Sequence, residues 1–241
     1  MDTRETALLL FVEMEKTKNF GSSLIRDTLN KYDYEDPREK AFLKRLTEGT
    51  LESLLMLDYV INAYSKTPTN KMKPLIRSLL RLSVYQILYM DTVPDSAACN
   101  EAVRLAKKKG FERLSGFVNG VLRTITRNKE EILNSESGFW QELQKNPVQA
   151  LSVRYSVPEW MISLWEAQYG EEKTEPMLER LKNGRPLTIR LDSRLTEEEK
   201  AQEIAAIEVA GVTVQKHQLY ADAWNLEGCE GIGHLLSLIH I

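Results

Sequence analysis

The side chains of this sequence best suited to chemistry are lysines and arginines that gather between residues 71 and 129, and the chemistry they offer is phosphate binding. This segment holds 12 Lys and Arg against 4 Asp and Glu, whereas residues 131–241 hold 10 against 18. Clustered cations on part of an otherwise acidic chain are typical of a nucleic-acid contact. The candidate residues are Arg4, Arg77, Arg81, Lys107, Lys108, Lys109, Arg113, Arg123, Arg127 and Lys129.

Two interpretations of these cations remain open, namely phosphate contact and an ordinary solvated or paired helix surface. Arg81 and Arg123 could each instead pair with Glu101 or cap a helix. The run 107–109 lies at a predicted helix end, and here nucleic-acid contact is favoured. Replacing these three lysines by alanine is expected to weaken binding several-fold while leaving stability unchanged.

Other reactive side chains lack the spacing that catalysis or metal binding requires. Cys99 falls in a predicted helix, where a small buried thiol is expected, and Cys229 has no base or cation cluster close in sequence. The three histidines show no ligand spacing, so no metal site is predicted; they are His217, His234 and His240.

Carboxylates and tryptophans have structural interpretations as well. The acidic runs 171–172 and 197–199 are expected at helix starts, where the helix dipole stabilises negative charge. Trp140, Trp160 and Trp165 could stack on bases, but aromatic residues at helical spacing more often pack in a core.

The first 130 residues are predicted to form an all-helical bundle that positions these cations. A first helix is expected between the Asp2–Glu5 capping box and Gly21, and further helices are expected over 22–31, 36–67, 73–88, 95–109 and 111–129. The segment 73–88 is apolar around most of its circumference and is therefore predicted to lie at the centre. Gly49 indicates a bend or a close packing point, and Gly116 with Gly120 predicts close contact between helices.

Beyond residue 130 the pattern changes, which predicts a helical connector over 131–184 and a small α+β module over 185–241. The alternating segment 186–191 predicts a strand, the capping box Thr196–Glu199 opens a helix that Gly211 ends, and 212–214 predicts a second strand. The apolar run 235–241 is expected to mark a truncated or frameshifted end, with a short docked strand as the alternative.

Four motifs at 36–42, 80–86, 93–103 and 117–123, together with Arg4-x-x-Ala7, resemble a known family. They are similar to the NusB-like domain at the N-terminus of bacterial small-subunit rRNA cytosine-C5 methyltransferases of the RsmB, Sun or Fmu type. The motifs at 155–160, 169–170 and 183–191 resemble the connector that follows that domain, although Val157 stands where a histidine is usual. A free-standing NusB factor has no such connector.

This resemblance implies an RNA-binding portion of an S-adenosylmethionine-dependent methyltransferase, with small-subunit rRNA as its partner. Methyl transfer in the family needs a glycine-rich cofactor loop and two cysteines in Pro-Cys and Thr-Cys motifs. These 241 residues contain neither, so no catalytic residue and no cofactor site is predicted and the chain alone is expected to be inactive.

An alternative function is that of a NusB-type transcription antitermination factor that acts with a ribosomal-protein partner. Under either function the chain is expected to be cytoplasmic. The two widely separated cysteines fit a reducing compartment, and no stretch of the sequence is apolar enough to predict a membrane span or a secretory signal.

Overall fold

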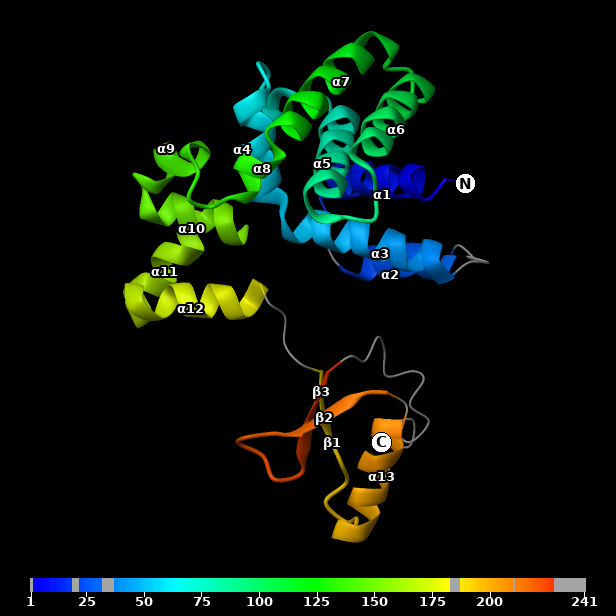
Figure 1. The fold of residues 1–241 in the computed structure, drawn as a ribbon, viewed down its shortest axis with the longest axis vertical. Coiled ribbons are helices and arrows are strands. Elements are labelled where there is room, and N and C mark those ends of the chain that lie inside the picture. Colours follow the sequence, from blue (N-terminus) through cyan, green and yellow to red (C-terminus); the bar gives the residue numbers. More distant parts are fainter. Residues whose placement is uncertain (1, 19–21, 32–36, 183–186, 210, 228–241) are drawn as a thin grey trace. The chain divides into compact units, whose positions relative to one another are not determined.

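The structure, a computed structural model, describes residues 2–18, 22–31, 37–182, 187–209 and 211–227. The chain divides into two compact units, Met1–Glu175 and Pro176–Ile241. Helices build the first unit, and a three-stranded sheet with one helix forms the centre of the second (Figure 1). The predicted fold class, mainly helical with a small α+β module, is confirmed.

Seven helices form a bundle with α5 at its centre, as the apolar circumference of that segment predicted. Eleven residues of α5 are buried, including the polar Ser78, Ser83 and Gln86. Its neighbours α1, α3, α4, α6 and α7 all contact it. The seven helices are α1 (Thr3–Thr17), α2 (Ser22–Lys31), α3 (Pro37–Glu52), α4 (Leu54–Tyr64), α5 (Pro74–Tyr89), α6 (Asp95–Lys108) and α7 (Glu112–Arg127).

The single long helix expected over 36–67 is in fact two helices, α3 and α4, which meet at Ser53. Gly49 does not make the bend, because the chain stays helical for three more residues. It is instead a close packing point: a Cβ there would lie 1.9 Å from the hydroxyl of Tyr85 on α5. The glycine therefore lets α3 and α5 approach each other.

The close helix contact predicted for Gly116 and Gly120 is wrong. Both residues are exposed on α7, and no atom lies within 4 Å of a Cβ placed at either position. The apolar side of α7 lies elsewhere on the helix, at Val118, Val121, Leu122 and Ile125.

The first part of the connector packs on the bundle through the aromatic side chains of its 3-10 turn. Trp140 stacks on Tyr59 with ring centroids 5.5 Å apart, and Phe139 stacks on Tyr64 at 5.7 Å. Trp140 therefore belongs to the core, as predicted, whereas Trp160 is 65% exposed. The connector comprises α8 (Lys129–Leu133), a 3-10 turn (Gly138–Trp140), α9 (Gln141–Gln144), α10 (Pro147–Tyr155), α11 (Glu159–Tyr169) and α12 (Glu171–Lys182).

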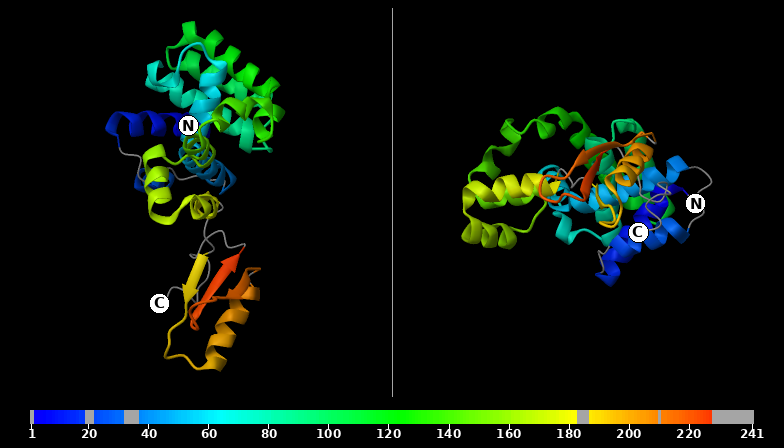
Figure 2. Two further views of the ribbon diagram at one scale, coloured as in Figure 1. Left: turned by 90° about the vertical axis from the view of Figure 1, so that its left-hand side faces the viewer. Right: turned by 90° about the horizontal axis from the view of Figure 1, so that it is seen from below.

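The second unit contains the predicted strand, helix and strand, and one further strand that the sequence analysis missed. The elements are β1 (Leu187–Arg190), α13 (Glu197–Val209), β2 (Thr213–Lys216) and β3 (Ala223–Glu227). The missed β3 is the central strand, paired antiparallel to both β1 and β2. Helix α13 covers one face of the sheet (Figure 2), where Ile207 joins Trp224 and Leu226 in a small core.

The capping box that opens α13 is confirmed in both directions. The backbone N–H of Thr196 donates to the Glu199 carboxylate at 2.8 Å, and the N–H of Glu199 donates to the Thr196 hydroxyl at 3.3 Å. The interpretations of Cys229, His234, His240 and the run 235–241 fall outside the described residues.

Candidate nucleic-acid interface

Arg77 and Arg81 of α5 lie in a network of ion pairs inside the bundle. Arg77 donates Nε and Nη2 to the two carboxylate oxygens of Glu15 on α1, at 2.9 and 2.6 Å. Arg81 donates in the same two-pronged way to Asp58 on α4, at 2.7 and 2.6 Å, and its Nη1 reaches Glu15 at 2.9 Å. The hydrogen bonds that Arg77 donates to the Glu15 carboxylate raise the pKa of Arg77.

This network neutralises its own charge, since two guanidinium groups meet two carboxylates. The Glu15 side chain is 7% exposed and that of Arg81 is 12% exposed. The pairing of Arg81 with Glu101 that the sequence suggested is therefore wrong. Arg81 pairs with Glu15 and Asp58 instead and so joins α1 and α4 to α5. Because charge-assisted pairs of this kind are shielded from solvent, neither arginine presents a free cation for phosphate.

The three lysines at the end of α6 differ in their surroundings: two pair with a buried carboxylate, and one is exposed. Lys108 and Lys109 place their ammonium groups 2.6 and 2.7 Å from the carboxylate of Glu5 on α1. Hydrogen bonds from both lysines lower the pKa of Glu5 to about 2. Only Lys107 is exposed without such a partner among the described residues. The expectation that replacing all three lysines leaves stability unchanged is thus wrong. The replacement would leave the buried Glu5 carboxylate without its two lysine partners.

Three further cations are held by neighbours in the bundle. Arg4 donates Nε to Gln86 at 2.7 Å, and its guanidinium lies 5.0 Å from the ring centroid of Phe42. Lys129 pairs with Asp95 at 3.2 Å. Arg104, which the sequence analysis did not select, donates to Glu101 and Asp2.

Several cations on α7 and near the turn before it are exposed and have no carboxylate partner in the described part of the chain. Arg113, Arg123 and Arg127 are exposed on α7, where Arg123 donates only to the neutral Asn119 at 3.2 Å. Lys73 reaches the same turn, because its ammonium lies 5.8 Å from the ring centroid of Phe111. Together with Lys107 these residues form the exposed basic edge of the bundle.

Some members of this edge could not be selected from the sequence. Lys73 precedes α5, far along the chain from Phe111, so no local pattern predicted that they would meet. The pairing of Arg104 did have a local signal, since Glu101 lies three residues before it on the same helix.

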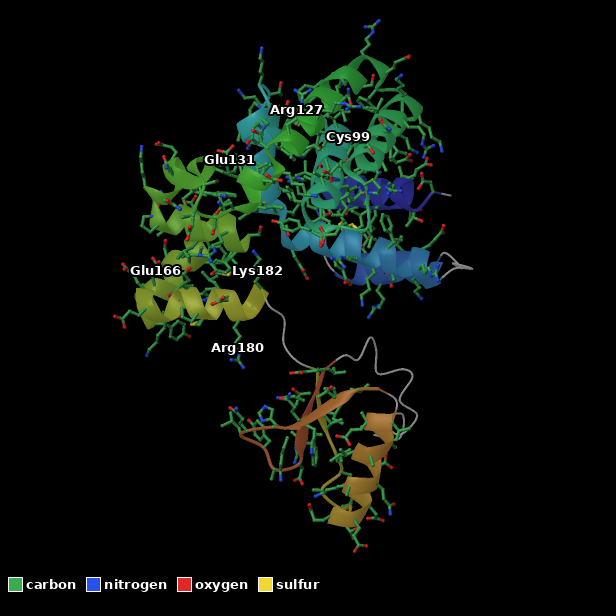
Figure 3. All side chains as sticks on the ribbon, viewed as in Figure 1. Cys99, Arg127, Glu131, Glu166, Arg180 and Lys182 are labelled. Carbon is green, nitrogen blue, oxygen red and sulfur yellow. The ribbon has the colours of Figure 1, made fainter. Side chains whose placement is uncertain are left out.

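Cys99 is a buried structural thiol, as predicted. Its sulfur lies 3.8 Å from the Thr126 hydroxyl, and burial raises the pKa of the thiol, which disfavours the reactive thiolate. Figure 3 shows Cys99 among the bundle helices and Arg127 on α7. Across the described residues no group of three or more His, Cys, Asp and Glu side chains is placed to hold a metal ion.

In the part of the chain that the structure describes, no helix combines the length and the apolar character needed to cross a membrane.

Two parts of the chain match known domain families. Residues 1–127 match the NusB family, and residues 157–230 match the ferredoxin-like domain of RsmF/B-like methyltransferases. Because the first match covers more than half of the chain, this protein belongs to the NusB family. The second match distinguishes it from NusB domains that stand alone.

Its relatives include larger rRNA methyltransferases. The chain is 30% identical over 223 residues to the probable ribosomal RNA small subunit methyltransferase B of Bacillus subtilis, covering 92% of this chain and 47% of that protein. The corresponding protein of Synechocystis is 29% identical, with 86% and 45% covered. The transcription antitermination protein NusB of Dictyoglomus thermophilum is 37% identical over 110 residues, which is 44% of this chain and 76% of that protein.

The chain therefore spans about half the length of the methyltransferases that it matches. Among solved structures, PH0851 superposes with a TM-score of 0.59 at 16% identity, covering 96% of this chain and 50% of that one. This likeness supports the fold.

Proposed function

We propose that this chain is the RNA-binding N-terminal portion of an S-adenosylmethionine-dependent rRNA cytosine-C5 methyltransferase, which positions small-subunit rRNA for a catalytic domain outside these 241 residues. The observation that carries this proposal is the succession of a NusB family domain and an RsmF/B-like ferredoxin-like domain in one chain. We place the RNA-binding bundle at 1–130, the connector at 131–184 and the α+β module at 185–241. The protein would act in the cytoplasm, where its rRNA substrate is assembled.

The cofactor chemistry of the family finds no fitting residues in the described structure. A strand-to-helix turn that holds S-adenosylmethionine would be rich in glycine, and the connection from β1 to α13, residues 191–196, contains none. Cys99 follows alanine and is buried, so it offers no nucleophile. We therefore assign RNA binding, and no methyl transfer, to this part of the protein.

The cations proposed to contact RNA are those of the exposed basic edge, namely Lys73, Lys107, Arg113, Arg123 and Arg127. Support comes from their exposure and from the lack of carboxylate partners among the described residues. The other candidates, Arg4, Arg77, Arg81, Lys108, Lys109 and Lys129, have partners within the fold, which supports a structural role for them.

The test is a titration of the chain with a fragment of small-subunit rRNA at three salt concentrations, with calorimetry against S-adenosylmethionine in parallel. Salt-sensitive RNA binding without cofactor binding is expected, because neutralised phosphates release their counterions. Failure to bind the RNA at low salt would contradict the proposal, and stoichiometric cofactor binding would contradict the assignment of roles.

The alternative, an antitermination factor with a ribosomal-protein partner, is favoured only by the shorter matches to NusB proteins, which cover 44% of this chain. Tight, stoichiometric binding of a ribosomal protein that raises RNA affinity would support it instead.

A further inference from the structure

The outward side of α7 carries three arginines around two glycines. Arg113, Gly116, Gly120, Arg123 and Arg127 follow one another in steps of three and four residues, so they share one side of the helix. All five are exposed. From Arg113 to Arg127 this side extends for about 21 Å at a helical rise of roughly 1.5 Å per residue. These five residues form the arginine face of α7.

The charges of the arginine face are not neutralised by the described part of the chain. The carboxylates nearest to it in sequence, Glu112 and Glu130, form no ion pair with its arginines. The contrast with the paired arginines of α5 is strong, because each of those meets a carboxylate at 2.6 Å. The arginine face is thus the part of α7 that can accept several phosphates at once.

The arginine face has no flat apolar group on which an unstacked base could lie. The larger apolar residues of this segment, Phe111, Leu114 and Phe117, are partly buried and pack against the core of the bundle. Proteins that bind single strands rely on exposed aromatic side chains for base stacking. Cations without such side chains favour recognition of the RNA backbone and its shape.

We infer that the arginine face docks on the backbone of double-helical RNA, an inference that rests on the proposed RNA-binding function and names its substrate class. A-form RNA has a wide, shallow minor groove that proteins recognise by shape and by phosphate and 2′-hydroxyl contacts. The open space above Gly116 and Gly120 lets the RNA come close to the helix backbone. Arg113 at one end, and Arg123 with Arg127 at the other, then lie on the phosphates that flank the groove.

The experiment compares an RNA duplex of about 16 base pairs with one of its strands alone, each titrated at three salt concentrations. The wild-type chain is expected to bind the duplex about ten-fold more tightly than the single strand. The variant R113Q/R123Q/R127Q should lose about ten-fold in duplex affinity, with its log–log salt slope flattened by roughly 0.7 to 0.9 for each lost contact. The matched control K16Q/K40Q/K44Q removes the same charge from exposed positions on α1 and α3 and should change little.

A second variant separates shape from charge. In G116L/G120L every cation is kept, so duplex binding should fall while the salt slope stays near that of the wild type. Its melting temperature should not fall, because both positions are exposed with open space around them. If the wild type binds RNA but prefers the single strand, or if the arginine variant behaves as the lysine control, or if the leucine variant binds the duplex normally, the inference is overturned and the proposed function stands. If the wild type binds neither RNA at low salt, the proposed function falls and the inference with it.

Discussion

Arg77 donates two hydrogen bonds to the Glu15 carboxylate, from Nε at 2.9 Å and from Nη2 at 2.6 Å, and so links α5 to α1. Such fork-like pairs gain both energy and a fixed geometry. Arg81 adds a third hydrogen bond to the same carboxylate. One acidic side chain on α1 thus holds two arginines of α5 at once.

Replacing Glu15 by glutamine should destabilise the bundle by about 3 kcal/mol or more, because two largely buried guanidinium groups would lose a charged partner. The Glu15 side chain is 7% exposed, whereas that of Glu13, two residues earlier and in an exposed pair with Lys16, is 50% exposed. Glu13→Gln is therefore the control, with an expected change within about 0.5 kcal/mol. Urea unfolding measures both, and equal midpoints for the two variants would contradict the structural role of the network.

Acid should remove the contribution of Glu5. Its pKa lies at about 2 in the folded chain and near 4.5 ordinarily, because Lys108 and Lys109 hydrogen-bond the carboxylate. A lowered folded pKa gives stability that is present above pH 4.5 and is lost as the pH falls toward 2. The gap in unfolding free energy between wild type and Glu5→Gln should thus narrow between pH 6 and pH 3. A gap independent of pH would show that the carboxylate is not stabilised by these lysines.

Alanine should have opposite effects at two glycines. Gly49→Ala places a methyl group 1.9 Å from the Tyr85 hydroxyl, so we expect a loss of about 1–3 kcal/mol from overpacking. Gly120→Ala meets no atom within 4 Å and should gain up to about 1 kcal/mol from helix propensity. Thermal unfolding of the two variants distinguishes these signs, and a stabilised Gly49→Ala would refute the close approach of α3 to α5.

Alanine substitutions at Lys107 and at Lys109 should have different effects on stability and on RNA binding. Lys107→Ala should leave stability within about 0.5 kcal/mol and weaken RNA binding, because this side chain is exposed and unpaired among the described residues. Lys109→Ala should lower stability, since the lysine lies 2.7 Å from the buried Glu5. Paired unfolding and RNA titrations measure both effects, and the reverse order of stabilities would contradict the assignment.

Limited proteolysis should show that the connector folds with the bundle. Ile132, Leu143 and Val153 belong to the same core as α5, and the backbone N–H of Met56 donates to the Ser156 hydroxyl at 3.3 Å. We expect the first cuts beyond residue 175 and a stable fragment ending there. A fragment ending near residue 130 would instead show that the connector is a separate folding unit.

Local patterns predicted the helices and the central position of α5, because apolar periodicity depends on neighbours three and four residues apart. They failed where partners are distant in sequence. Nothing near Arg81 indicates Asp58 and Glu15, and nothing near Lys108 indicates Glu5. The exposed basic edge could be found only after the fold showed which cations pair with carboxylates, because its members are cations that remain unpaired in the described part of the chain.

The missed strand had a usable signal. Trp224 and Leu226 alternate with Asn225 and Glu227, which is the pattern of a strand with one buried face. No sequence signal showed that the glycines of α7 are exposed, because an exposed glycine and a packed glycine look the same in a single sequence.

The position of β3 in the sheet also sets the time at which the second unit can assemble during synthesis. Strands β1 and β2 pair only with β3, and β3 is the last of the three to be made. At a translation rate of about 5–20 residues per second, β1 waits roughly 2–7 seconds for its partner strand. Until then the backbone groups of β1 lack the strand with which they pair in the folded sheet. The nascent protein therefore passes through a stage in which a complete helical bundle carries an unfinished sheet.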